Sequence, residues 1–224
     1  MEGGALLTEE FKEFSETVVP FLHITTQIEG RKHDDLLGTV GGRGFPSFFF
    51  LDAKGEVVGQ VQGSDRTAEG FAESAKQAQE FIDVRNKAAA GDKGAKFKYA
   101  LARAGMGKLT VEEFKKEIKG VGKLSDADQA AYNGALADLM VDEIQATAVG
   151  ERFAKMLSEG LVPVDNMKQV NFYWALFGYA EHVKDVALMG KAFTGLQTAA
   201  GDDPRFVRAV QNAEQRLAKA NETQ

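Results

Sequence analysis

The sequence predicts two folded parts: a small α/β unit over residues 1–90 and an all-helical unit over residues 95–224. In the first part, the apolar run of residues 48–51 is short and rich in phenylalanine, which favours a strand over a helix. In the second part, apolar residues recur at helical spacing behind capping residues, namely the capping box of Thr110 and Glu113 and the N-caps Ser125 and Asp165. Between them, residues 91–94 contain glycine and charge but nothing apolar, which is typical of a domain boundary.

The first 40 residues predict a helix, a strand and a second helix. Thr8 is a suitable N-cap, and the first helix is expected to end before Pro20, because proline disfavours helical geometry in the residue that precedes it. Residues 21–28 largely alternate between apolar and polar and predict a strand. Residues 33–40 predict a short helix with its leucines directed inward.

The next segment predicts a hairpin and a long helix. Pro46 cannot donate to a sheet ladder and is expected at the entry of the strand over residues 48–51. The sequence Asp-Ala-Lys-Gly at 52–55 is turn chemistry, and residues 56–61 predict the antiparallel return strand. Thr67 is the expected N-cap of a helix that runs to about residue 90. The first part is thus expected to form a small mixed sheet with flanking helices.

This order of elements resembles the thioredoxin-like superfamily from its first helix onward. The motif that carries the resemblance is Gly-x-Pro, a buried strand, Asp-x-x-Gly and a strand, over residues 44–61. The resemblance implies that Pro46 is a cis-proline. It also implies that the residues around this proline bind an extended peptide through backbone hydrogen bonds, a form of strand addition. The peptide site expected from the resemblance consists of Arg43, Gly44, Phe45, Pro46 and Ser47.

Relatives of this shape carry a central strand and a Cys-x-x-Cys motif before the first helix, and the resemblance places both upstream of residue 1. Without that strand, the edges of residues 21–28 and 47–52 would be unpaired. Three arrangements resolve this: the two strands pair directly, a second copy lends a strand in a homodimer, or the natural protein is longer. We favour the third, with a cysteine or selenocysteine motif in the upstream segment.

The chain contains no cysteine. A disulfide, a thiolate metal site and a cysteine nucleophile are therefore excluded, and this chain cannot perform dithiol exchange by itself. The three histidines have no ligand-pair spacing, and the acidic pairs are adjacent in sequence, so on a helix they point in different directions. We therefore predict no catalytic residue, no metal site and no cofactor.

The formal net charge of −6 gives no electrostatic basis for binding nucleic acid or an anionic membrane. No apolar run approaches the roughly 20 residues that span a bilayer. The first residues do not form a secretory signal. These features predict a cytoplasmic location for the chain as it stands, and an extracytoplasmic location stays open for a longer form.

The helical part resembles tetratricopeptide-type helical hairpins. Trp174, Phe177 and Gly178 occupy the aromatic, large-apolar and glycine positions of that repeat. We interpret the cluster around Trp174 as core, with a concave peptide-binding surface as the alternative.

Two function classes follow from these observations. The first is a non-catalytic module, thioredoxin-like with a helical domain, that binds a protein or peptide partner. The alternative is a shortened thiol-disulfide or selenocysteine oxidoreductase whose redox motif lies upstream.

Overall fold

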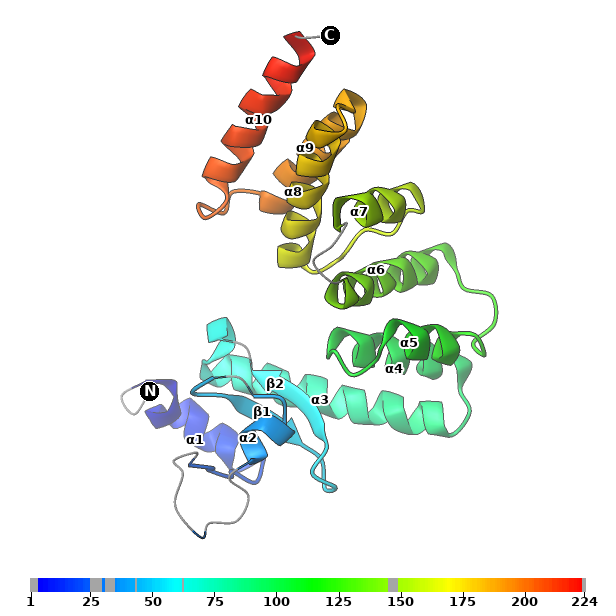
Figure 1. Cartoon of the computed structure of the whole chain (residues 1–224). Helices are drawn as coiled ribbons and strands as arrows, with labels where there is room; N and C mark the ends of the chain where they lie inside the picture. The colour runs from blue at the N-terminus through cyan, green and yellow to red at the C-terminus, as the bar shows by residue number, and fades with distance from the viewer. Residues whose placement is uncertain are drawn as a thin grey trace. The chain divides into compact units, whose positions relative to one another are not determined.

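The computed structural model of the chain describes residues 4–24, 30, 35–42, 44–61, 63–144 and 149–222. The chain divides into two compact units, Met1–Ala90 and Gly91–Gln224 (Figure 1). The described residues are mostly helical, and their strands form a two-stranded antiparallel sheet in the first unit. Of the helices within these ranges, none has the length and hydrophobicity needed to cross a bilayer.

The first unit surrounds a β-hairpin with helices. Its elements are η1 (Ala5–Leu7), α1 (Glu9–Ser15), α2 (Leu36–Thr39), β1 (Phe48–Leu51), β2 (Val57–Val61), η2 (Gly63–Asp65) and α3 (Ala68–Ala89). The two expected caps are confirmed. The Thr8 side chain accepts a hydrogen bond from the backbone N–H of Phe11 at 3.2 Å, and Thr67 accepts one from Gly70 at 3.1 Å. Each satisfies a backbone donor that the first helical turn leaves free.

The hairpin forms where the sequence predicts it. Phe48 pairs with Val61 and Phe50 with Gly59, and the register shifts after Phe50. The Asp52 carboxylate accepts hydrogen bonds from the backbone N–H groups of Lys54 at 2.8 Å and Glu56 at 3.0 Å. Gly55 has a φ of 81°, a conformation that favours glycine. The turn is therefore fixed by its own side chain and by glycine.

Phe71 of α3 is the centre of an aromatic cluster in this unit. Its ring lies 5.0 Å from that of Phe11, 5.0 Å from that of Phe48 and 6.1 Å from that of Phe14, between ring centroids. Through these contacts α1, β1 and α3 pack together in one hydrophobic cluster. None of the described residues of α1, α2 or β1 is fully buried, however. The buried apolar residues of the unit belong to β2 and α3: Val58, Val61, Phe71, Ala78, Phe81 and Ala88.

The expected strand over residues 21–28 is wrong for the part that the structure describes. Residues 21–24 have no strand structure, and residues 25–29 lie outside the described ranges. Phe21 is 74% exposed and Leu22 is 83% exposed. A strand needs a neighbouring strand that pairs with its backbone hydrogen-bonding groups, and the alternation of apolar residues does not show whether such a neighbour exists. Over the described residues the sheet is antiparallel, and the expectation of a mixed sheet is corrected accordingly.

The helix expected over residues 33–40 is shorter in the structure. It is described as α2, while residues 33 and 34 lie outside the described ranges. Its N-cap residue, Asp35, makes no side-chain capping bond.

The second unit is all-helical over its described residues. Its helices are α4 (Lys93–Gly105), α5 (Val111–Ile118), α6 (Asp126–Glu143), α7 (Val149–Ser158), α8 (Asn166–His182), α9 (Val186–Ala200) and α10 (Val207–Glu222). Thr110 and Glu113 form the expected capping box at the start of α5. Ser125 and Asp165 cap α6 and α8 as predicted.

The core of the second unit is continuous from α4 to α10. The central helix α8 packs against α7 and α9, and α10 packs against α9 (Figure 1). Phe172, Leu176 and Phe177 of α8 are each 0% exposed. A small residue permits one close helix contact: a Cβ added to Gly195 of α9 would lie 2.2 Å from Cε1 of Tyr173 on α8. Glycine at this position therefore lets the tyrosine ring lie against the α9 backbone.

The side chain of Asp138 on α6 is hydrogen-bonded to the segment that leads into α8. Its carboxylate accepts hydrogen bonds from the backbone N–H groups of Val164 at 2.9 Å and Asp165 at 3.2 Å. Partial burial raises the pKa of the Asp138 carboxyl above its ordinary value, because desolvation disfavours the charged form. Nearby, Lys168 of α8 forms an ion pair with Asp142 of α6 at 2.7 Å.

Candidate functional site

The turn that precedes β1 contains most of the residues expected to bind a peptide. The Ser47 hydroxyl donates a hydrogen bond to the carbonyl of Gly44 at 2.6 Å and closes the turn. The Phe45–Pro46 peptide bond is cis, as the resemblance implies. Both of these residues are exposed, and β1 begins two residues beyond the proline. Arg43 lies outside the described residues.

Both the side chain and the backbone polar groups of Phe45 are open to contact with another molecule. The side chain is 71% exposed. Within the described ranges, its backbone N–H and C=O have no hydrogen-bond partner. Backbone polar groups are otherwise paired as a rule, so a donor and an acceptor left free beside the start of a strand are available to another chain.

Arg66 is a residue of this site that the sequence did not indicate. It lies between η2 and the cap of α3, and its Nη2 donates a hydrogen bond to the carbonyl oxygen of Pro46 at 2.8 Å. Its guanidinium carbon lies 5.8 Å from the ring centroid of Phe48. The contact joins residues 20 positions apart in the chain. No local pattern marks such a contact, since it depends on how the hairpin and α3 pack.

The far end of the hairpin is held by an ion pair. Arg85 of α3 donates to the Asp52 carboxylate at 2.7 Å and to Glu56 at 3.1 Å. The Asp52 side chain is only 6% exposed. The hydrogen bond from Arg85, followed by that from the backbone N–H of Glu56, lowers the pKa of Asp52. Because these groups satisfy one another, this pair fixes the hairpin on α3 and is not a candidate for acid–base chemistry.

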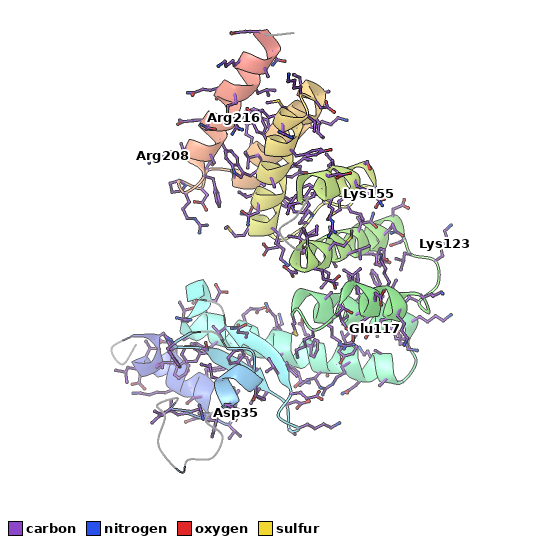
Figure 2. All side chains as sticks on the ribbon, in the orientation of Figure 1. Asp35, Glu117, Lys123, Lys155, Arg208 and Arg216 are labelled. Carbon is purple, nitrogen blue, oxygen red and sulfur yellow. The ribbon has the colours of Figure 1, made fainter. Side chains whose placement is uncertain are left out.

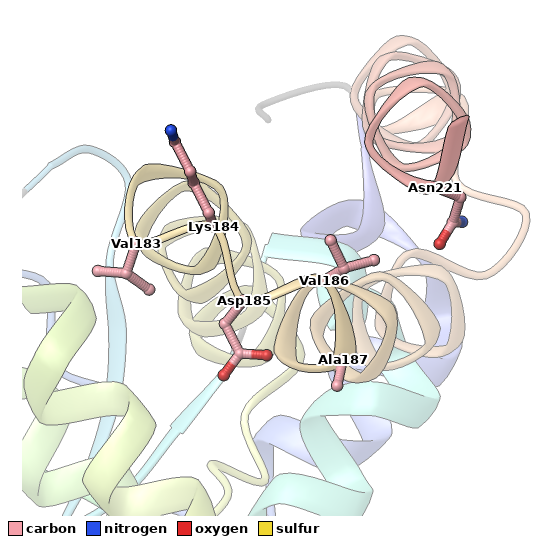
Figure 3. Close-up of a pocket in the computed structure, with 6 residues that line it drawn as sticks. All are labelled: Val183, Lys184, Asp185, Val186, Ala187 and Asn221. Atoms are coloured by element: carbon pink, nitrogen blue, oxygen red, sulfur yellow. The ribbon is translucent and has the colours of Figure 1, made fainter. Parts of the chain in front are cut away.

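Two hollows in the second unit lack the convergent polar groups of an active site. The first, of about 650 Å³, is lined by the turn between α8 and α9 and by Asn221 of α10 (Figure 3). Its one carboxylate, Asp185, caps α9 by accepting from Leu188 at 2.9 Å. The second hollow, of about 710 Å³, is lined by α7, α8 and α9. Its Ser158 and Thr194 hydroxyls donate to carbonyls of their own helices.

The surroundings of Trp174 combine core and surface. Phe177 in the same helix is fully buried, whereas Trp174 is 38% exposed. The guanidinium carbon of Arg216, labelled on α10 in Figure 2, lies 5.9 Å from the Trp174 ring centroid. Arg216 also forms an ion pair with Glu181, with its Nε 2.8 Å from Oε1. The arginine therefore joins α10 to α8 beside the indole ring.

The described residues contain no group of three or more histidine, aspartate or glutamate side chains placed to hold a metal ion. The Gly44–Ser47 turn with Arg66 is thus the best-defined candidate site. Comparisons of the chain with protein-family models, curated protein sequences and solved structures found no match.

Proposed function

We propose that this protein is a non-catalytic, thioredoxin-like binding module whose turn over residues 44–47 docks an extended segment of a partner protein. The observation that carries the proposal is Phe45, which is 71% exposed with both backbone polar groups free among the described residues. A partner segment lying along this turn would bond to the N–H and C=O of Phe45 and continue along the outer edge of β1. Backbone bonds would supply affinity, and side-chain contacts would supply selectivity.

We propose binding rather than thiol chemistry because the chain has no cysteine. The resemblance to thioredoxin-like proteins supports the proposed binding function, because four elements occur in the order that the resemblance implies: the turn at Pro46, β1, the Asp52–Gly55 turn and β2. Dithiol exchange at this turn would require thiols from outside the 224 residues. The alternative of an oxidoreductase in a longer protein therefore stays a prediction about that longer protein.

The test is selection of peptides from a random phage-displayed library on the immobilised protein, followed by titration of the selected peptides. Phe45→Pro removes the backbone N–H of the turn, and we expect it to weaken binding by about tenfold or more. Phe21→Ala is a control for exposed phenylalanine, because Phe21 is 74% exposed and lies on another segment. It should be compared with Phe45→Ala, which removes the side chain and keeps the N–H.

Two outcomes would contradict the proposal. The first is selection that yields no peptide, or only peptides whose affinity is unchanged in Phe45→Pro. The second is a change of mass by light scattering in Phe45→Pro relative to the wild type, because the occupant of the turn would then be a second copy of this chain. That result would instead favour the homodimer, one of the three arrangements that the sequence left open.

A further inference from the structure

Arg66 differs from the other half-buried arginines of the described residues. Arg85, Arg103 and Arg216 are each partly buried, with side chains 22%, 28% and 34% exposed, and each pairs with a carboxylate. Arg66 is also partly buried, yet within the described ranges its guanidinium has no acidic partner. Its contacts are a neutral carbonyl, that of Pro46, and the face of the Phe48 ring.

The guanidinium of Arg66 is already partly desolvated. Its Nε is buried without a hydrogen-bond partner. Taking a charged donor out of water is unfavourable unless a hydrogen-bonded counter-charge offsets the loss. Of the five N–H groups of a guanidinium, one is used in the bond to Pro46, so the terminal nitrogens can still donate.

The charged guanidinium of Arg66 lies next to the residue that we propose binds the partner segment. The guanidinium bonds to the residue that directly follows Phe45, whose own N–H and C=O are free among the described residues. A segment that bonds to Phe45 therefore passes within reach of the terminal nitrogens of Arg66. Carboxylates are the protein groups whose planar geometry and charge match these donors.

We propose that the segment bound at the Gly44–Ser47 turn carries a carboxylate that pairs with Arg66. This inference rests on the proposed function, and it adds the chemical class of the ligand. The carboxylate is either an aspartate or glutamate side chain or a free C-terminus, since both present the same two oxygens. The first unit thus selects acidic or C-terminal segments although the chain as a whole is acidic.

The experiment uses the tightest Phe45-dependent peptide from the library selection, synthesised in four forms. Its acidic side chains are kept or converted to amides, and its C-terminus is free or amidated. Each form is titrated against the wild type, Arg66→Gln and Lys54→Gln by fluorescence anisotropy. Lys54→Gln removes the same charge from an exposed turn of the hairpin, so it controls for general electrostatic attraction.

We expect removal of one kind of carboxylate to weaken binding to the wild type and to Lys54→Gln by about tenfold, with little effect on binding to Arg66→Gln. Which peptide form loses affinity identifies the source of the carboxylate. If Arg66 only holds the turn, Arg66→Gln weakens all four forms by the same factor, and the inference is overturned. Equal binding of all four forms to the wild type also overturns it.

Failure of this inference is distinguishable from failure of the proposed function. Peptides that depend on Phe45 but not on their carboxylates would refute the role of Arg66 and leave the binding turn in place. A selection without any Phe45-dependent peptide would refute both. Circular dichroism of Arg66→Gln should match the wild type, and a variant that has lost its structure is replaced by Arg66→Lys, which keeps the charge and loses the planar fork.

Discussion

The two units of this protein bury their apolar residues to very different degrees. In the second unit, buried side chains from α4 to α10 form one cluster. Among the described residues of the first unit, full burial is confined to β2 and α3, and several large apolar side chains before residue 52 are exposed: Leu7, Val19, Phe21, Leu22, Ile24, Phe45 and Leu51. Single exposed apolar residues are ordinary on a protein surface. The comparison shows that the second unit has the larger buried core, while the smaller first unit keeps a larger share of its large apolar side chains exposed.

The largest expected effect is on the core of the second unit. Phe177→Ala removes a side chain that is 0% exposed and should lower the free energy of unfolding by about 3–5 kcal/mol. Urea unfolding followed by tryptophan fluorescence measures it, because Trp174 is the sole tryptophan and lies in this unit. Leu22→Ala, at a residue that is 83% exposed, should change the stability of the first unit, followed by hydrogen exchange in β2 and α3, by no more than about 0.5 kcal/mol. Similar losses in the two variants would remove the contrast between the units.

A second substitution tests whether the two cores are separate. Phe71→Ala removes the centre of the aromatic cluster of the first unit and should destabilise that unit by about 3 kcal/mol. Hydrogen exchange followed by mass spectrometry should show the loss of protection in β2 and α3. The urea midpoint of the Trp174 signal should stay unchanged, because the core cluster of the second unit contains none of these residues. A shift of that midpoint would show that the units unfold together.

Two glycines of α9 give a matched pair within the second unit. Gly195→Ala places a Cβ 2.2 Å from the Tyr173 ring, so α8 and α9 must separate, with a cost of about 1–3 kcal/mol. Gly190→Ala meets no atom within 4 Å and should stabilise the helix by about 0.5–1 kcal/mol. Thermal unfolding by circular dichroism should therefore move in opposite directions. A gain in both variants would mean that the contact between α8 and α9 is loose.

The smallest expected effect concerns pH and the hairpin of the first unit. Because Arg85 lowers the pKa of Asp52 below its ordinary value of 3.8, the carboxylate stabilises the fold above that value. The contribution is lost as the pH falls through 3.8 toward the lower pKa of the folded state. Asp52→Asn should therefore flatten the acid side of the stability profile of the first unit, measured by hydrogen exchange in β2. An unchanged profile would show that the ion pair contributes nothing there.

Local features of the fold could be predicted from the sequence, and non-local ones could not. Thr8, Thr67 and the capping box at Thr110 were predictable because a cap and its donor lie within one helical turn. The turn at Asp52 is equally local. The apolar–polar alternation of residues 21–28 predicted a strand, and the prediction is wrong for residues 21–24 because strand formation also depends on a pairing neighbour, which periodicity does not reveal.

The candidate site shows the same division. The Gly-x-Pro motif located Gly44, Phe45, Pro46 and Ser47, since the motif and the turn are one segment. Arg66 could not be found in this way, because its bond to Pro46 forms only after the hairpin and α3 have packed together. Whether an arginine is paired is also a property of the folded state, and no composition or spacing rule would have distinguished Arg66 from Arg85.

The carboxylate of Asp138 has a consequence for cooperativity. It ties α6 to the residues that open α8, so a single side chain helps join the first three helices of the second unit to the remaining four over the described residues. Domains built from successive helices can unfold in sections when the interface between neighbours is weakened. We expect Asp138→Ala to turn one sharp melting transition of this unit into two, with the part that contains Trp174 the last to melt.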